Sequence, residues 1–116
     1  MGKKSQRKGA NGERELTSLL QGYGYATERG GSETFGTIPD VVGLPGIHIE
    51  CKRTERLDLL GAMQQAQRDA ARFLDGKPAV FHRKNRSPWL VTMTLEDWIS
   101  LYRRFSGEES GGMGNC

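Results

Sequence analysis

The spacing of apolar residues changes several times along this chain, and each change predicts a new element. Leu16, Leu19 and Leu20 follow the i, i+3, i+4 spacing of one helix face. Residues 47–52 instead alternate between apolar and polar, which is typical of a strand. Turns that contain glycine and proline separate such segments. The pattern predicts helices over 13–22, 57–74 and 95–105, and strands over 23–28, 38–43, 47–52, 78–82 and 89–93.

The two later helices also carry apolar faces that we expect to be buried. Gly76 is placed to end the second helix, and Thr94 is the expected N-cap of the third. The expected buried positions are Leu60, Met63, Ala70, Ala71 and Leu74 in the second helix, and Trp98, Ile99, Leu101, Tyr102 and Phe105 in the third.

The element order is α-β-β-β-α-β-β-α, which predicts a small α/β sandwich with a mixed central sheet of about five strands flanked by helices. The turn at 44–46 is so short that the strands on either side of it should form a hairpin. A chain of 116 residues has room for one domain, which we place at 9–105. We expect a flexible basic arm over 1–8 and a disordered Gly/Ser-rich tail over 106–116.

The net charge of +3 is unevenly distributed. The first eight residues hold four of the 17 basic residues, so the rest of the chain has 13 basic and 14 acidic residues. A basic arm on a near-neutral body suggests a nucleic-acid partner, although a solubilising tail is the simpler alternative. Cys51 and Cys116 fit neither a disulfide framework nor a zinc site. With no secretory signal and no apolar run of about 18 residues, we expect a cytoplasmic protein without membrane contact.

Three charged residues in the middle of the chain carry the chemistry. Glu50 and Lys52 project from the same face of the third strand, and the hairpin brings Asp40 beside Glu50. Two adjacent carboxylates repel each other unless a cation lies between them, and oxygen ligands favour Mg²⁺. Lys52 would position the attacking water or offset charge in a phosphoryl transition state. Taken separately, Glu-x-Lys is often a surface ion pair and Pro-Asp a common turn.

At these residues the chain resembles the PD-(D/E)xK nuclease superfamily. More closely, it resembles the archaeal-type Holliday-junction resolvases and their phage-encoded relatives. The resemblance covers about residues 7–81 and departs from the archaeal pattern after 76. The segments that carry it are RKGANGERE at 7–15, YATERGGS at 25–32, Pro39-Asp40 and Glu50-Cys51-Lys52.

The resemblance implies a restriction-endonuclease-like core and a metal site shaped by Glu13, Asp40 and Glu50. The backbone carbonyl of Cys51 would be a further metal ligand, and Lys52 the catalytic lysine. Glu13 lies on the inward stripe of its helix, where a bare carboxylate is costly, although a capping role in the first helical turn is an alternative.

The resemblance also implies a catalytic glutamine on the second helix and a set of residues that contact DNA phosphates without reading the sequence. We favour Gln65, with Gln64 next, whereas Gln67 lies on the apolar stripe. The basic turn after the fourth strand is equally consistent with a solvated hairpin. The resemblance points to Arg14, Arg29 and Ser32, and Arg7 and Lys8 extend the same positive surface. The further basic candidates for DNA contact are Arg53, Arg83, Lys84 and Arg86.

The remaining notable residues are expected to have structural roles. Glu15 lies about 200° from Glu13 on the helical wheel and should face solvent. His82 is expected to be a satisfied strand residue, and the Cys51 side chain a small buried hydrophobe. Trp89 and Trp98 should anchor the core or an interface.

We therefore expect a Mg²⁺-dependent endodeoxyribonuclease, with Mn²⁺ as a plausible substitute, that acts on branched DNA such as a four-way junction and not on small molecules. A junction needs two symmetric cuts, which favours a homodimer. The alternatives are another PD-(D/E)xK nuclease that acts on flaps, ends or restriction-like sites, and a non-catalytic nucleic-acid-binding protein. A basic RNA-binding module is disfavoured because no aromatic-rich RNA motif is present.

Overall fold

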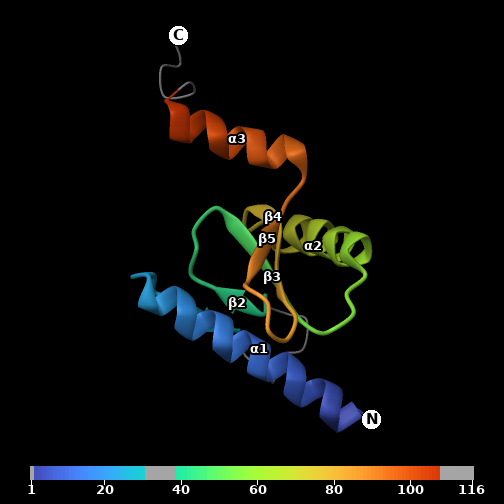
Figure 1. Ribbon diagram of the computed structural model, residues 1–116. Coiled ribbons are helices and arrows are strands. Elements are labelled where there is room, and N and C mark those ends of the chain that lie inside the picture. The colour runs from blue at the N-terminus through green and yellow to red at the C-terminus, as the bar shows by residue number, and fades with distance from the viewer. Residues whose placement is uncertain (1, 31–38, 108–116) are drawn as a thin grey trace.

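The computed structural model describes residues 2–30 and 39–107, with 2–9 as backbone only, and has the element order expected from the sequence (Figure 1). The helices are α1 (Gly2–Gly22), α2 (Leu59–Phe73) and α3 (Leu95–Ser106). The strands are β1 (Glu28–Arg29), β2 (Val41–Val42), β3 (Ile47–Arg53), β4 (Lys77–Arg83) and β5 (Leu90–Thr92).

The five strands form one mixed sheet in the order β1-β2-β3-β4-β5. Neighbours are antiparallel except β3 and β4, which are parallel and joined through α2. The predicted hairpin is confirmed, with Val41 opposite Ile49. The predicted α/β class with a mixed sheet is therefore confirmed.

Alternation along β3 divides the interior into two layers. Ile49 and Cys51 pack with Leu16 of α1 on one side of the sheet. Ala62, Met63 and Ala66 of α2 pack with Val80 on the other side. Figure 1 shows α1 and α2 on opposite sides of the sheet. The same alternation turns Glu50 and Lys52 toward α2.

Two glycines permit close approaches that hold these layers in place. A Cβ on Gly12 would lie 2.4 Å from Cβ of Arg53, so a side chain here would push α1 away from β3. Gly76 has φ +127°, and a Cβ there would lie 2.2 Å from the carbonyl carbon of Gly46. Gly76 thus fixes the entry to β4. The helix itself ends earlier than expected, with Leu74 as its left-handed C-cap.

The first helix begins much earlier than the expected start at Glu13, because α1 includes residues 2–12. The polar composition of that segment suggested a flexible arm. However, Lys, Arg, Gln and Ala are good helix formers, and an existing helix extends at little cost. Residues 2–8 are thus helical, the expected flexibility of 1–8 stays a prediction, and residue 1 lies outside the described residues.

The first strand is shorter and later than the predicted 23–28. The backbone N–H groups of Tyr23, Gly24 and Tyr25 donate to carbonyls of the last turn of α1, so this segment completes the helix end. Gly24 has φ +103°, which suits such a helix stop. The strand therefore begins only at Glu28.

Part of the expected core is also at the surface. In α2 the buried residues are Ala62, Met63, Ala66 and Ala70, whereas Leu60 is 74% exposed and Leu74 is 86% exposed. Small residues let α2 approach the sheet, and the larger leucines lie beside this contact. Thr94 caps α3 as predicted, but no residue of α3 is buried. Figure 1 shows why: α3 extends away from the sheet.

Candidate active site

Strand β3 and helix α2 present two matching rows of side chains. Lys52, Glu50 and His48 recur every two residues along β3, while Gln65, Asp69 and Phe73 recur every four residues along α2. Two strand residues advance about 6.6 Å and four helix residues about 6 Å, so the rows stay in step. Three facing pairs therefore lie along one cleft: Lys52 with Gln65, Glu50 with Asp69, and His48 with Phe73.

The contacts at the two ends of these rows are close. Lys52 Nζ donates to Gln65 Oε1 at 3.1 Å and lies 3.4 Å from Glu50 Oε2. At the other end, the rings of His48 and Phe73 stack with centroids 6.2 Å apart. Of the three glutamines that the sequence left open, Gln65 is the one at the site, whereas Gln64 and Gln67 are exposed.

Asp40 reaches the same site from β2. Because Val41 pairs with Ile49, the next position along the ladder sets Asp40 opposite Glu50. Both line a pocket of about 330 Å³ together with Gln65 and Asp69. The sequence prediction that Asp40 and Glu50 come together is therefore consistent with the structure.

The electrostatics of this pocket favour a cation. Glu50 is only 3% exposed. Desolvation and the nearby charges of Glu13 and Glu50 raise the pKa of Asp40 to about 6, although Lys52 opposes this shift. A carboxyl group held against other carboxylates gains most from a bound metal ion. The donors at Asp40 and Glu50 are oxygens, which suits a hard ion such as Mg²⁺.

Glu13 contributes from α1. Its side chain is 19% exposed and its Oε1 lies 3.2 Å from Nε of Arg29. The inward position expected for Glu13 is thus observed, and it is near enough to raise the pKa of Asp40. The capping alternative for Glu13 was wrong, because α1 begins at Gly2 and Glu13 lies in the helix interior.

Cys51 follows Glu50 on β3, but its side chain points away from the site and into the core. Its side chain packs with Leu16, Ile49 and Phe81, as expected of a small hydrophobe. Burial, with the nearby carboxylates, raises the pKa of the thiol to about 12, so the sulfur stays protonated. The contact between the Cys51 backbone carbonyl and a metal, which the resemblance implies, stays a prediction.

Glu15 is not the solvated residue that the helical wheel suggested. Its carboxylate accepts hydrogen bonds from Arg53 Nε at 3.3 Å, from Trp89 Nε1 at 3.1 Å and from Arg83. Partial burial opposes ionisation, but these hydrogen bonds outweigh it and lower the pKa of Glu15. The wheel could not show this cluster because Arg83 and Trp89 come from the distant β4–β5 hairpin.

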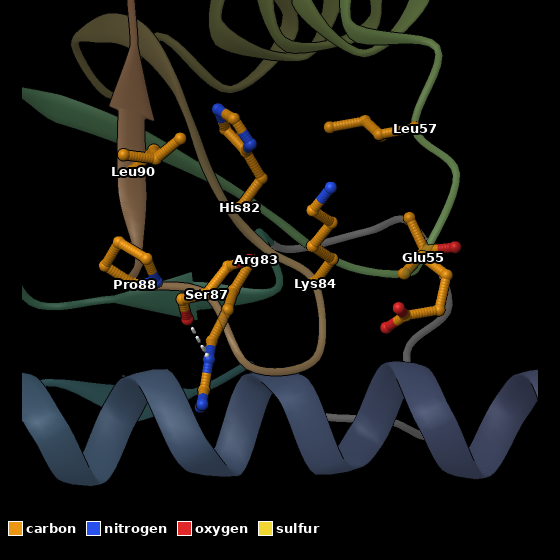
Figure 2. A pocket seen from close by; sticks show the side chains of 9 residues that line it. Glu55, Leu57, His82, Arg83, Lys84, Ser87, Pro88 and Leu90 are labelled. Carbon is orange, nitrogen blue, oxygen red and sulfur yellow. Dashed lines mark hydrogen bonds between the residues drawn. The ribbon is translucent and has the colours of Figure 1, made fainter.

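The expected DNA-contacting residues fall into three groups. Arg14, Lys84 and Arg86 are exposed. Arg29 is paired with Glu13, while Arg53 and Arg83 are paired with Glu15. Figure 2 shows the Arg83 side chain directed toward α1, with its Nε donating to the Ser87 carbonyl at 2.7 Å. Ser32 lies outside the described residues, as do the side chains of Arg7 and Lys8.

His82 and Trp89 have the structural roles expected of them, whereas Trp98 does not lie in the core. His82 lies 2.8 Å from Thr92 Oγ1 on the neighbouring strand, and burial lowers its pKa. Trp89 packs against the core as well as binding Glu15. Trp98 is 49% exposed and stacks on Tyr102 within α3, so it does not anchor the core.

The sequence analysis missed two residues in the cleft, His48 and Asp69. His48 is 1% exposed, and its Nδ1 lies 3.0 Å from both carboxylate oxygens of Asp75. Although burial opposes protonation, Glu50 and Asp75 raise the pKa of His48. Their spacing in the sequence could have identified both residues. His48 lies two residues before Glu50, as neighbours on one strand face do, and Asp69 lies four residues after Gln65, as neighbours on one helix face do.

The chain was then compared with known proteins. A sequence profile described as archaeal Holliday junction resolvase (Hjc) matches residues 4–102. Among proteins of curated function, none matches. The solved structure of Archaeoglobus fulgidus Hjc, a Holliday junction resolvase from an archaeal hyperthermophile, is similar with a TM-score of 0.56 and 26% identity. The similarity covers 74% of this chain and 72% of that one. Because the family profile spans most of its length, this chain belongs to the archaeal Holliday junction resolvase family.

Proposed function

We propose that this protein is a Mg²⁺-dependent endonuclease that resolves four-way DNA junctions. Family membership supports the resolvase activity, and the predicted resemblance to that family is confirmed. The observation that carries the metal dependence is the meeting of Asp40 and Glu50 beside Lys52 in one pocket. Mn²⁺, which also accepts oxygen ligands, is the expected substitute.

Asp40 and Glu50 would hold the metal, with the Cys51 carbonyl and Glu13 completing the site. When bound, the ion would polarise the scissile phosphate and lower the pKa of the attacking water. Attack forms a new P–O bond as the bond to the leaving oxygen breaks. Arg29 pairs with Glu13 at 3.2 Å and so offsets negative charge beside the site.

Lys52 would stabilise the charge that develops on the phosphate oxygens. Glu50 and Gln65 hold its ammonium group from two sides, at 3.4 Å and 3.1 Å. A cation fixed in advance lowers the barrier because it need not reorganise during the reaction. Gln65 is thus a positioning residue that acts through Lys52.

The DNA partner would be bound through its backbone. Exposed Arg14, Lys84 and Arg86 can contact phosphates without reading the bases. Two symmetric cuts require two active sites, which a two-fold homodimer supplies. The exposed aromatic side of α3, with Trp98, Tyr102 and Phe105, offers such a dimer a surface to bury.

The location that we propose is the cytoplasm of a prokaryotic or phage-infected cell, where DNA junctions form. Among the described residues, no helix combines the length and apolarity needed to cross a membrane.

The test compares the wild type with Asp40→Asn on a labelled four-way junction, a flap, a linear duplex and a single strand, each with Mg²⁺ or EDTA. Asp58→Asn is the matched control, since asparagine also caps a helix and the same charge is lost. We expect junction cleavage by the wild type and the control with Mg²⁺ only, and none by Asp40→Asn. Equal cleavage by Asp40→Asn would contradict the metal site. Equally efficient cutting of linear duplex would instead favour another nuclease of the superfamily.

A further inference from the structure

The buried imidazole of His48 has one nitrogen with a partner and one without. Asp75 holds Nδ1 through two 3.0 Å contacts, which favours a proton on Nδ1. The other nitrogen, Nε2, is buried and makes no hydrogen bond with any residue that the structure describes. It lies 3.5 Å from Glu50 Oε1, and His48 lines the pocket that also holds Asp69.

Nε2 faces acceptors, not donors. One ligand atom each from His48, Glu50 and Asp69 lie within 4.8 Å of one another. Two carboxylates held together beside a buried nitrogen that has no hydrogen bond are costly unless a cation lies among them. A metal-ligating histidine commonly donates its other N–H to a carboxylate, which is the arrangement of Asp75 and His48.

Rigid elements hold the three groups in place. His48 and Glu50 stand on β3 in the middle of the sheet, and Asp69 on α2 faces them. Phe73, one turn beyond Asp69, stacks on the His48 ring at an interplanar angle of 15°. The ring orientation is thus fixed from two sides, by Phe73 and by Asp75.

We propose that His48, Glu50 and Asp69 bind a divalent transition metal such as Zn²⁺ or Co²⁺. An imidazole nitrogen with carboxylate oxygens suits these ions better than Mg²⁺ or Ca²⁺, which require oxygen ligands. The site adjoins the one proposed for Mg²⁺ and shares Glu50 with it, but His48 and Asp69 belong to it alone. The inference concerns metal binding and does not require that the chain cleave DNA.

The test is calorimetric titration of the intact protein with Zn²⁺, together with the visible absorption of the Co²⁺ form. The variants are His48→Gln, Asp69→Asn and Asp75→Asn, with His82→Gln as the matched control. We expect one Zn²⁺ per chain in the wild type and His82→Gln, and no tight binding by His48→Gln. Binding should be about 10- to 100-fold weaker in Asp69→Asn and Asp75→Asn. The ¹⁵N resonance of His48 Nε2 should shift on Zn²⁺ binding.

Asp69 is half-buried, so Asp69→Asn keeps the test valid if His48→Gln does not fold, which circular dichroism will show. Zn²⁺ binding unchanged in both Asp69→Asn and Asp75→Asn would overturn the proposal. Absence of Zn²⁺ binding by the wild type would overturn it as well. That result would indicate that Nε2 of His48 carries a proton and does not bind a metal ion.

Asp40→Asn separates this inference from the proposed function. It should abolish Mg²⁺-dependent cleavage yet keep His48-dependent Zn²⁺ binding. Cleavage without Zn²⁺ binding would leave the nuclease intact and refute the second site. Zn²⁺ binding without cleavage would support the second site and refute the proposed nuclease activity.

Discussion

Two clusters of partly buried charge lie on the two sides of the sheet, and they are balanced very differently. In the cluster around Glu15, one carboxylate receives hydrogen bonds from two guanidinium groups and an indole. In the cleft between β3 and α2, the carboxylates of Asp40, Glu50 and Asp69 lie in one pocket with Arg72 and beside Lys52, and no described hydrogen bond joins Asp40 or Asp69 to either cation. The pKa of Glu15 is lowered, whereas that of Asp40 is raised to about 6.

This difference indicates a structural role for the Glu15 cluster and a functional role for the cleft. The Glu15 cluster is satisfied by its own side chains and ties the β4–β5 hairpin to α1. In the cleft the carboxylates are crowded together and the pKa of Asp40 is raised, so the cleft is suited to bind a cation. Strongly shifted carboxyl groups in a pocket are typical of functional sites. The following predictions test whether the two clusters differ in this way.

The largest expected effect is on cleavage by Lys52→Met, in the unbalanced cleft. Loss of the positioned ammonium group should lower single-turnover junction cleavage about 10²- to 10³-fold, because charge on the phosphate is no longer offset. The melting temperature of metal-free protein should fall as well, because Glu50, whose side chain is 4% exposed, loses a counter-charge, and saturating Mg²⁺ should restore it. Stopped-time cleavage assays and thermal melts measure the two effects. A large fall in melting temperature with unchanged cleavage would reverse the roles that we assign to the two clusters.

Glu15→Gln should give the opposite result in the balanced cluster. The substitution leaves Arg53, whose side chain is 15% exposed, with only the more distant Glu55 carboxylate, at 3.7 Å, as a described counter-charge. We expect a loss of about 1–2 kcal/mol in the free energy of unfolding, discounted for the partial exposure of Glu15. Urea unfolding measures the loss, and the exposed Glu28→Gln is the control. Junction cleavage at low temperature should stay within a few-fold of wild type, and a collapse in cleavage by a folded Glu15→Gln protein would contradict a structural role.

The two carboxyl groups should also give opposite pH dependence in metal-free protein. The pKa of Asp40 is raised above its unfolded value of 3.8 to about 6, so the native state binds more protons between these pH values. Its contribution to stability therefore falls as the pH rises from about 4 to 6. The pKa of Glu15 is lowered, so its contribution is present above its unfolded value of 4.5 and is lost as the pH falls.

Urea unfolding between pH 3 and 7 can separate these slopes. Asp40→Asn should remove the decline between about pH 4 and 6, and Glu15→Gln should reduce the loss at acid pH. Saturating Mg²⁺ should also suppress the Asp40 slope, because the ion replaces the proton. An Asp40→Asn profile identical to wild type would show that the Asp40 carboxyl is not held against its neighbours.

The same comparison shows what could be predicted from the sequence. The approach of Asp40 to Glu50 depends on a short turn and a two-residue alternation, both of which are local patterns. Gln65 was favoured by resemblance and lies at the site. The Glu15 cluster was missed because Arg83 and Trp89 lie 68 and 74 residues away in the chain. No helical wheel includes partners from a distant hairpin.

Two other errors have similar physical causes. Apolar residues on a helix were taken as buried, but α3 has no part of the sheet to cover and stays exposed. The first helix was expected to begin only at Glu13, although a polar segment with good helix formers can extend an existing helix. Hydrophobic pattern predicts which face an element can bury, whereas the partner that covers that face is set by the whole fold.

The smallest expected effect distinguishes adjacent glutamines within the cleft. Gln65→Ala removes the acceptor 3.1 Å from Lys52 Nζ, so the ammonium group keeps only Glu50 to hold it. Loss of one such hydrogen bond is worth about 1 kcal/mol, which corresponds to roughly fivefold slower cleavage. Gln64→Ala is the matched control because Gln64 is exposed on the neighbouring position of α2, and its cleavage rate should equal that of wild type.

In the Lys52→Met background Gln65→Ala should have no further effect, because a residue that acts through Lys52 has nothing left to position. An additive loss in the double variant would instead mean that Gln65 contacts the phosphate or the water directly.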